Sequence, residues 1–195
     1  GGSSKVYKVR CLESKRFFAL KRVKTPDFAK HLFPVFENEL QLLLRLKGKN
    51  KIIQVVDAEV CRESGKISIL MELGEQDLSQ FILSSPPVSI AQARKLWRDI
   101  LEAVGEIHNA KIVHSDLKPA NFLFVDGTLK LIDFGIAKQI GDNTTNVDRD
   151  GAFGTASFMA PELLDELSPT MKRSADIWSV GVILYQMVFR RTLFD

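Results

Sequence analysis

The stretch HSDLKPANFLFVDGTLKLIDFG, residues 114–135, decides the fold around which the chain is organised. Inside it, Asp126 and Gly127 separate two apolar runs, residues 121–125 and 128–132. Asp-Gly between two such runs is the strongest short-range indication of a two-residue β-hairpin. Counting outward from the turn pairs position 125 with 128, 123 with 130, and 121 with 132. The sequence therefore predicts that Asn121 and Asp133 leave the open end of this hairpin side by side, about 5 Å apart at the backbone.

Oxygen-bearing side chains converge at that open end. Asp116 precedes Asn121 by five residues in a loop that contains Pro119, and Lys118 lies between them. Carboxylate and amide oxygens suit Mg²⁺, which binds through one or two carboxylates plus substrate phosphates. A solvated carboxylate at a polar turn is the preferred interpretation for one isolated Asp. For the whole set, including Asp133, a metal site is favoured.

The composition is that of an ordinary globular protein. The chain has 195 residues, of which 45% are hydrophobic and 26% charged. A net charge of +3 is too small and too dispersed to indicate a nucleic-acid or membrane partner. Cys11 and Cys61 show no metal-ligand spacing, so free thiols in a reducing compartment are expected. No signal peptide is visible, and no apolar run approaches the ~20 residues that span a bilayer. These observations predict a soluble, intracellular protein.

Two segments in the first quarter of the chain carry charged groups on apolar faces. Residues 16–23 predict a strand, and period two gives it one face of Phe17, Ala19, Lys21 and Val23. Residues 33–47 predict a helix with the apolar stripe Phe36, Leu40, Leu43 and Leu44. Glu39 lies on or beside that stripe, where a carboxylate is expensive unless it is paired. Lys47 and Arg45 on the same helix are candidate partners.

Further along, periodicity predicts four more elements. Residues 52–60 and 66–73 form two strands joined by a turn, and Ser89 to Gln92 is a capping box. The capping box opens a helix that runs to about Asn109 with one apolar face: Leu96, Ile100, Leu101, Val104 and Ile107. Residues 174–189 predict a helix that is apolar nearly all round, which is typical of a helix buried in a large core.

Three motifs in this order carry a family resemblance. Residues 114–121 (HSDLKPAN), 133–135 (DFG) and 160–162 (APE) resemble the catalytic loop, the metal motif and the end of the activation segment of eukaryotic protein kinases. The resemblance implies a bilobal α+β fold. Residues 1–73 would form an upper lobe with a small antiparallel sheet and one helix. Residues 74–195 would form the hinge and an incomplete, mainly helical lower lobe, with an activation segment over 133–162.

The same resemblance assigns roles to residues of this chain. Asp116 would accept or orient the proton of the substrate hydroxyl, and Lys118 would stabilise the transferred phosphoryl group. Lys21 would position the phosphates of ATP and pair with Glu39. Thr155 would hydrogen-bond to Asp116 and Lys118. The implied Mg²⁺ ligands are Asn121 and Asp133.

Residues around the nucleotide follow from the kinase pattern as well. Gly1 and Gly2 would belong to a glycine-rich phosphate loop that lacks its first glycine, although a frayed terminus explains them equally on composition. Met71 would be the gatekeeper before the hinge. The implied ATP contacts are Gly1, Gly2, Val6, Ala19, Lys21, Met71, Glu72, Leu73, Gly74 and Leu123.

The chain is most similar to the monopolar-spindle (TTK-like) dual-specificity checkpoint kinases. Ser115 replaces the arginine that usually binds an activation-loop phosphate. Autophosphorylation at Thr144 and Thr145 through transient self-association is implied, with Lys138 and Arg149 as the nearest basic partners. The resemblance predicts an ATP- and Mg²⁺-dependent kinase of protein Ser/Thr, with dual specificity and a spindle or kinetochore location as finer implications. A pseudokinase scaffold is the alternative, but such proteins normally lose Lys21, Asp116 or Asp133.

The chain is also expected to be a fragment, cut inside the glycine-rich loop and after the last predicted helix. On that hypothesis the helix over 174–189 leaves apolar faces uncovered. Poor expression, aggregation and negligible activity are then expected of the segment alone.

Overall fold

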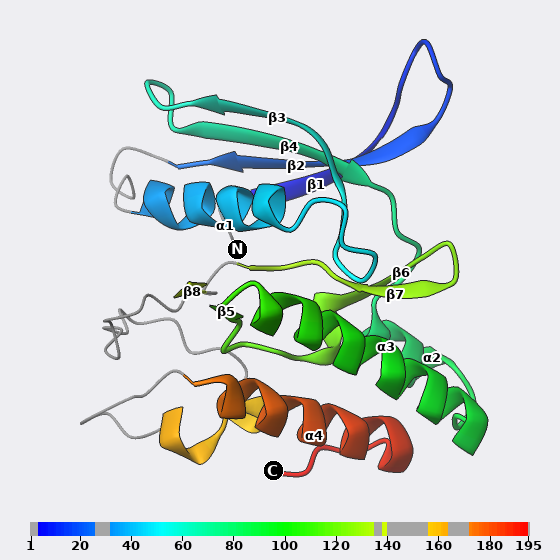
Figure 1. Ribbon diagram of the computed structural model, residues 1–195. Coiled ribbons are helices and arrows are strands. Elements are labelled where there is room, and N and C mark those ends of the chain that lie inside the picture. The colour runs from blue at the N-terminus through cyan, green and yellow to red at the C-terminus, as the bar shows by residue number, and fades with distance from the viewer. Residues whose placement is uncertain (1–3, 26–31, 135–137, 140–155, 164–171, 195) are drawn as a thin grey trace.

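The computed structural model describes residues 4–25, 32–134, 138–139, 156–163 and 172–194. They form two lobes, one above the other (Figure 1). The upper lobe holds β1 (Ser4–Arg10), β2 (Phe17–Lys24), α1 (Phe33–Arg45), β3 (Val55–Cys61) and β4 (Lys66–Glu72). The lower lobe holds α2 (Leu78–Ser84), α3 (Ile90–Asn109), β5 (Ile112–Val113), β6 (Phe122–Val125), β7 (Thr128–Leu131), β8 (Lys138–Gln139) and α4 (Arg173–Phe189). Short 3₁₀ turns span Pro119–Asn121, Ala156–Phe158 and Pro161–Leu163.

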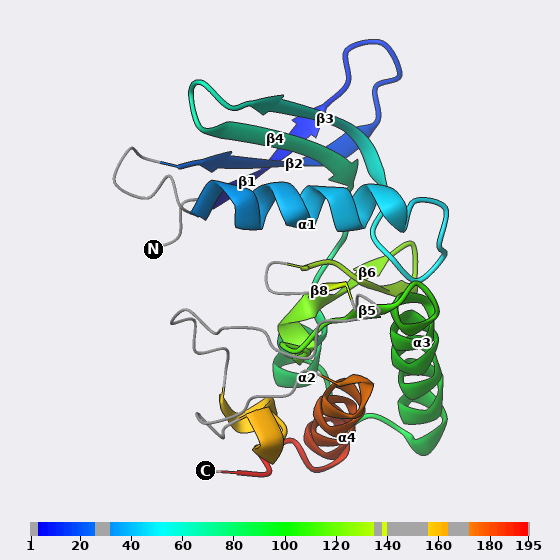
Figure 2. The ribbon, with the colours of Figure 1, turned by 60° about the vertical axis from the view of Figure 1, so that its left-hand side comes forward.

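The upper lobe is a four-stranded antiparallel sheet in the order β1-β2-β4-β3, with α1 packed on one face (Figures 1 and 2). The faces of β2 and β4 alternate strictly, because Val23, Ile67 and Ile69 are at most 2% exposed while Arg22 and Lys24 are exposed. This arrangement confirms the predicted α+β fold with one helix in the upper lobe. Phe17 departs from the prediction, since it is 49% exposed at the far end of β2 beneath Lys8 and Arg10.

The predicted hairpin is confirmed in register. Val125 pairs with Thr128 and Leu123 with Lys130, and the Ile132 amide donates to the Asn121 carbonyl at 2.9 Å. Asp126 and Gly127 have φ values of 48° and 71°, the positive values that a type I′ turn requires of both central residues. This turn therefore sets which residues of the two strands face the hinge.

The predicted extents of the helices α1 and α3 are confirmed, but one residue of each predicted apolar face is exposed. Leu44 in α1 and Leu101 in α3 are each 40% exposed, although both were assigned to apolar faces. A helix turns about 100° per residue. Each of the two leucines lies past the edge of the buried arc, which Leu42 and Ala103 complete instead. The capping box of Ser89 and Gln92 is confirmed by hydrogen bonds in both directions.

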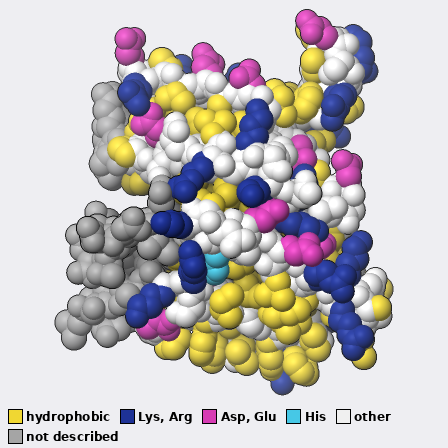
Figure 3. Space-filling view, in the orientation of Figure 1, with side chains coloured by type: hydrophobic (Ala, Val, Ile, Leu, Met, Phe, Trp, Pro, Cys, Tyr) yellow, Lys and Arg dark blue, Asp and Glu magenta, His cyan; other side chains and the backbone are white. Residues whose placement is uncertain are grey.

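α4 is buried on one side only. The all-round burial that is typical of so apolar a helix is not found in the described residues, whereas the uncovered apolar faces that were also expected are present. Val180 and Ile183 belong to the main hydrophobic cluster and are at most 1% exposed, whereas Ile177 and Trp178 are 51% and 40% exposed. Trp178 stacks on Phe194 with ring centroids 6.1 Å apart. Apolar side chains gather on this part of the surface (Figure 3).

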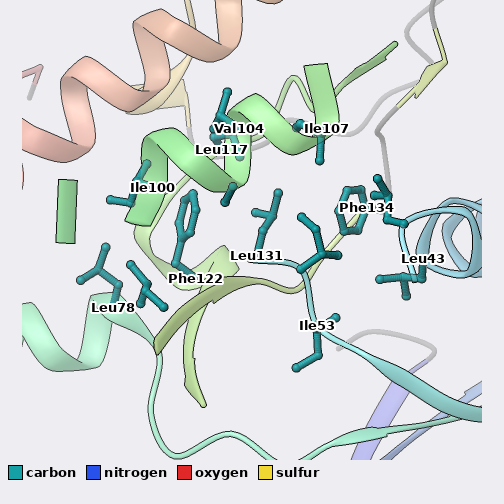
Figure 4. Packing of buried hydrophobic residues seen from close by; sticks show 14 of the residues in the cluster. Leu43, Ile53, Leu78, Ile100, Val104, Ile107, Leu117, Phe122, Leu131 and Phe134 are labelled. Carbon is teal, nitrogen blue, oxygen red and sulfur yellow. The ribbon is translucent and has the colours of Figure 1, made fainter. Parts of the chain in front are cut away.

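The main hydrophobic cluster runs through both lobes (Figure 4). Leu43 from α1 and Ile53 from the loop after it meet Leu131 and Phe134 near the hairpin. Ile100, Val104 and Ile107 from α3 continue the cluster into the lower lobe. Because the cluster is continuous, it packs α1 together with the β6–β7 hairpin.

Two smaller expectations concern chemistry outside the core. Cys11 and Cys61 are both free thiols, as predicted. Among the helices of the described residues, none has the length and apolar character that crossing a bilayer demands.

Candidate active site

Lys21 and Glu39 form an ion pair between β2 and α1. Lys21 Nζ lies 2.5 Å from Glu39 Oε1, and the side chains are 16% and 2% exposed. Burial raises the pKa of the Glu39 carboxyl above its ordinary value of 4.5, while the Lys21 charge opposes that rise and the Asp133 charge adds to it. The predicted pairing of Glu39 with Lys21 is confirmed, and the alternative partners Lys47 and Arg45 are excluded.

The loop after β5 places Asp116 and Lys118 together. Lys118 Nζ lies 2.7 Å from Asp116 Oδ2, and both side chains are partly exposed. The Asp116 amide donates to His114 Nδ1 at 3.3 Å, and His114 Nε2 contacts the Asp133 carbonyl oxygen. Since Nδ1 accepts a hydrogen bond, Nε2 carries the proton and donates. His114 thus ties the loop of Asp116 to the strand end that carries Asp133.

Asn121 is oriented by the turn that precedes β6. Its side chain is 3% exposed, and Nδ2 donates to the Asp116 carbonyl at 3.2 Å. This contact uses the amide nitrogen and leaves Oδ1 as the oxygen available to a cation. Asp133 is exposed and leaves the same end of the hairpin. One amide oxygen and one carboxylate form a donor set that fits Mg²⁺ when phosphate oxygens complete its coordination.

Asp176 anchors this loop from α4, and sequence reasoning did not assign it that role. Its carboxylate is fully buried and accepts the amides of His114 and Ser115 at 3.0 and 2.8 Å. His108 Nε2, at the end of α3, lies 2.7 Å from the same group. A carboxylate in a helix that is otherwise largely apolar was the available indication, because a buried charge needs partners.

Ser115 takes a backbone conformation that few residues adopt. Its φ is 65°, its side chain is 3% exposed, and Oγ has no hydrogen-bond partner. A short, enclosed hydroxyl does not reproduce the reach or the charge of an arginine. Position 115 therefore has no cationic side chain with which to bind an anion.

A second unpredicted ion pair fixes the start of the hinge. Lys130 Nζ contacts both carboxylate oxygens of Glu72 at 2.6 and 2.8 Å, and the Gln54 amide donates to Glu72 Oε1 at 2.8 Å. Lys130 lies directly across the hairpin from Leu123. The sequence around Lys130 did not indicate this pairing, because Glu72 is 58 residues away in the chain.

The hinge packs tightly on β6. A Cβ atom on Gly74 would lie 2.2 Å from Leu123 Cδ2, so the position has no room for a side chain. The Glu75 amide donates to the Phe124 carbonyl at 2.8 Å, and the Phe124 amide donates to the Gln76 carbonyl at 3.0 Å. The segment between the lobes is thereby held along the strand that carries Leu123.

The other predicted nucleotide contacts occupy the inner face of the sheet or lie outside the described residues. Val6 is the cross-strand partner of Lys21, and Ala19 is the partner of Met71. Val6 is 64% exposed, whereas Ala19 and Met71 are 9% exposed, and Leu73 is half-buried after the end of β4. The predicted residues outside the described part of the chain are Gly1, Gly2, Thr144, Thr145, Arg149 and Thr155, together with the side chain of Lys138.

Lys51 connects the loop after α1 to the lower lobe. Its Nζ lies 2.5 Å from Asp99 and 3.3 Å from Glu102, and its amide donates to Glu106 at 3.2 Å. The Ile53 amide donates to the Leu131 carbonyl at 3.0 Å. These contacts join the loop that follows α1 to α3 and β7.

Comparisons with known proteins agree with this geometry. The family model of the protein kinase domain matches residues 1–195. Serine/threonine-protein kinase mph1 of Schizosaccharomyces pombe is 43% identical over 100% of this chain and 30% of its own length. Dual specificity protein kinase TTK of Mus musculus is 40% identical over 100% of this chain and 24% of its own. Serine/threonine-protein kinase MPS1 of Saccharomyces cerevisiae is 39% identical over 97% and 26%.

The chain spans less than a third of the length of these relatives. The similarity to the MPS1 and TTK kinases that the motifs indicated is confirmed. With a bilobal fold, a paired Lys21 and Glu39, and a family match over its whole length, the chain belongs to the protein kinase domain family.

Proposed function

We propose that this chain is the catalytic part of an ATP- and Mg²⁺-dependent protein kinase that phosphorylates Ser and Thr. The observation that carries the proposal is the convergence of Asp116, Lys118, Asn121 and Asp133 at one hairpin end. Bound Mg²⁺ would neutralise charge on the ATP phosphates and orient them. Asn121 and Asp133 are the residues that would hold it.

The chain's own side chains supply the remaining roles. Asp116, kept next to the Lys118 ammonium, would accept the hydrogen bond of the substrate hydroxyl and orient it for attack. Lys118 would stabilise the charge of the transferred phosphoryl group, and Lys21 would hold the remaining phosphates. Glu39 keeps Lys21 in place at 2.5 Å. Catalysis here is positioning and charge stabilisation, which is the mode suited to phosphoryl transfer.

The pseudokinase alternative has less support. Lys21, Asp116 and Asp133 are all present, and the Lys21–Glu39 pair is formed. Dual specificity, self-association for autophosphorylation at Thr144 and Thr145, and an intracellular spindle or kinetochore location belong to the proposal through the resemblance to the TTK and MPS1 kinases.

The test is Asp133→Asn in the intact protein, assayed for transfer of labelled phosphate from Mg-ATP to a peptide. Asp126→Asn is the matched control, because it makes the same chemical change at the exposed turn of the same hairpin. We expect Asp133→Asn to abolish Mg²⁺-dependent turnover with an unchanged Tm, and Asp126→Asn to retain it. Normal turnover and metal dependence in Asp133→Asn would remove Asp133 from this role.

A further inference from the structure

The face of the upper sheet turned away from α1 is hollowed into a groove of about 720 Å³. We call it the outer-sheet groove, and its walls include Lys5, Tyr7, Arg22, Lys24, Glu59 and Lys66. Arg22 and Lys24 flank Lys21 and Val23 along β2, and Lys21 pairs with Glu39 of α1. The residues that line the groove and the Lys21–Glu39 pair therefore lie on opposite faces of the sheet, and α1 covers one of these faces (Figure 1). The volume is within the range of sites that hold small ligands or a few residues of a peptide.

The groove brings like charges directly opposite each other. Lys5 is the cross-strand partner of Arg22, and Lys24 is the cross-strand partner of Lys66. Directly opposed residues have Cβ atoms about 5 Å apart, and like charges in that position destabilise a sheet. The groove contains two such pairs, and a bound anion would reduce the repulsion between their positive charges.

Little within the described part of the protein compensates this charge. Glu59 is the carboxylate among the described walls of the groove, against four cations. No ion pair at or below 4.0 Å joins any of these four cations to another described residue. The hydroxyl groups of Tyr7, Ser64 and Ser68 also line the groove and can donate hydrogen bonds.

We propose that the outer-sheet groove binds a peptide segment of a partner protein through a phosphorylated Ser or Thr. A phosphate carries about −1.5 to −2 charges and three strong acceptor oxygens, so it suits a hollow lined by four cations and by hydroxyl-bearing residues. A carboxylate supplies a single charge. The apolar ring of Tyr7 and the aliphatic stems of the lysines give flanking peptide residues a surface to contact.

The position of the groove gives such binding a consequence, which rests on the proposed kinase function. A phosphorylated protein held on the outer face leaves the opposite, nucleotide-side face open. A second site on the same partner could then be phosphorylated while the first remains bound, at the raised effective concentration that tethering provides.

The binding test does not need activity. A fluorescein-labelled peptide of ten residues with one phosphothreonine is titrated with the intact protein carrying Asp133→Asn, and Kd is measured by anisotropy without nucleotide. We expect the phosphopeptide to bind about tenfold or more tightly than its unphosphorylated twin. Arg22→Glu with Lys66→Glu should remove this difference. Arg94→Glu with Lys95→Glu, an equal charge change on the exposed face of α3, should leave Kd within about twofold.

Three results would overturn the proposal. The first is equal affinity for the phosphorylated and unphosphorylated peptides. The second is an equal loss of phosphopeptide affinity in the groove variant and the control variant. The third is displacement of the phosphopeptide by a single-stranded oligonucleotide of matched charge as readily as by unlabelled phosphopeptide. The groove variant without Asp133→Asn should keep its kcat/KM on a short unphosphorylated peptide. Loss of that activity as well would show that the substitutions act through the fold rather than through the groove.

Discussion

Replacing Lys21 by Met should expose how strongly the buried ion pair is coupled to catalysis. The substitution keeps the aliphatic stem but leaves the Glu39 carboxylate, with a side chain 2% exposed, without its cation. Removing one partner of a buried pair costs about 3–5 kcal/mol. If the whole cost falls on the active geometry, kcat/KM decreases by about two to four orders of magnitude, because each 1.36 kcal/mol is tenfold in rate. Loss of the phosphate contact adds to this.

The reverse substitution is less damaging to the fold. Glu39→Gln leaves the Lys21 ammonium without its charge partner, but the Lys21 side chain is 16% exposed and can reach water. We expect Lys21→Met, Glu39→Gln and the double variant to form a non-additive cycle in kcat/KM. The double variant should lose less than the sum of the singles by about 1–3 kcal/mol, the range for residues in contact.

The pH dependence of stability provides a second test of the pairing between Lys21 and Glu39. Burial raises the pKa of Glu39 above 4.5 in the folded protein, so the folded state holds a proton that the unfolded state has lost. The contribution of Glu39 to stability therefore declines as pH rises from 4.5 through the raised pKa. Lys21→Met removes the opposing charge and extends this decline to higher pH. The difference in Tm between wild type and Lys21→Met should grow from pH 5 to pH 8.

Two results would refute this reasoning. Losses in kcat/KM that add within about 0.3–0.5 kcal/mol would show that Lys21 and Glu39 act independently. A Tm difference that stays constant across the pH range would show that the Glu39 carboxylate is not held in a buried site.

The hinge contacts give two further predictions. Gly74→Ala should lower Tm and raise KM for ATP, because the new methyl group would lie 2.2 Å from Leu123 Cδ2. Adding Leu123→Ala should recover part of the lost Tm. Gly105→Ala is the control, because a Cβ atom at Gly105 has no neighbouring atom within 4 Å. An unchanged KM for ATP in Gly74→Ala would contradict a tightly packed hinge. Lys130→Met should raise KM for ATP severalfold with a smaller change in kcat, because Glu72 loses its cation, and Lys130→Arg or an added Glu72→Gln should restore it. A drop in kcat alone would contradict a role at the hinge.

Local features of the fold were predictable because their causes lie within a few residues. The Asp126–Gly127 turn fixed the register of β6 and β7, and the Ser89–Gln92 box fixed the start of α3. The predicted burial of a side chain was wrong where burial depends on which other element packs beside the helix or strand. Leu44 has the residue type and approximate spacing of an apolar stripe, yet it lies past the edge of the contact that α1 makes.

The candidate site divides in the same way. The motifs placed Asn121 next to Asp133 through local geometry, and an apolar setting indicated that Glu39 needs a partner. Asp176 and Lys130 were missed as structural contributors, since their partners are 61 to 68 and 58 residues away. No local periodicity encodes which of many charged residues meets which across such distances.

The carboxylate of Asp176 reaches the loop that it anchors late in synthesis. His114 and Ser115 leave the ribosome 62 and 61 residues before the group that holds their amides. At about 5–20 residues per second, that interval lasts several seconds. During it, the sheet, α1 and the hinge can already assemble, while the loop bearing Asp116 lacks its anchor. During this window the nascent chain is expected to lack the anchored loop on which the proposed activity depends.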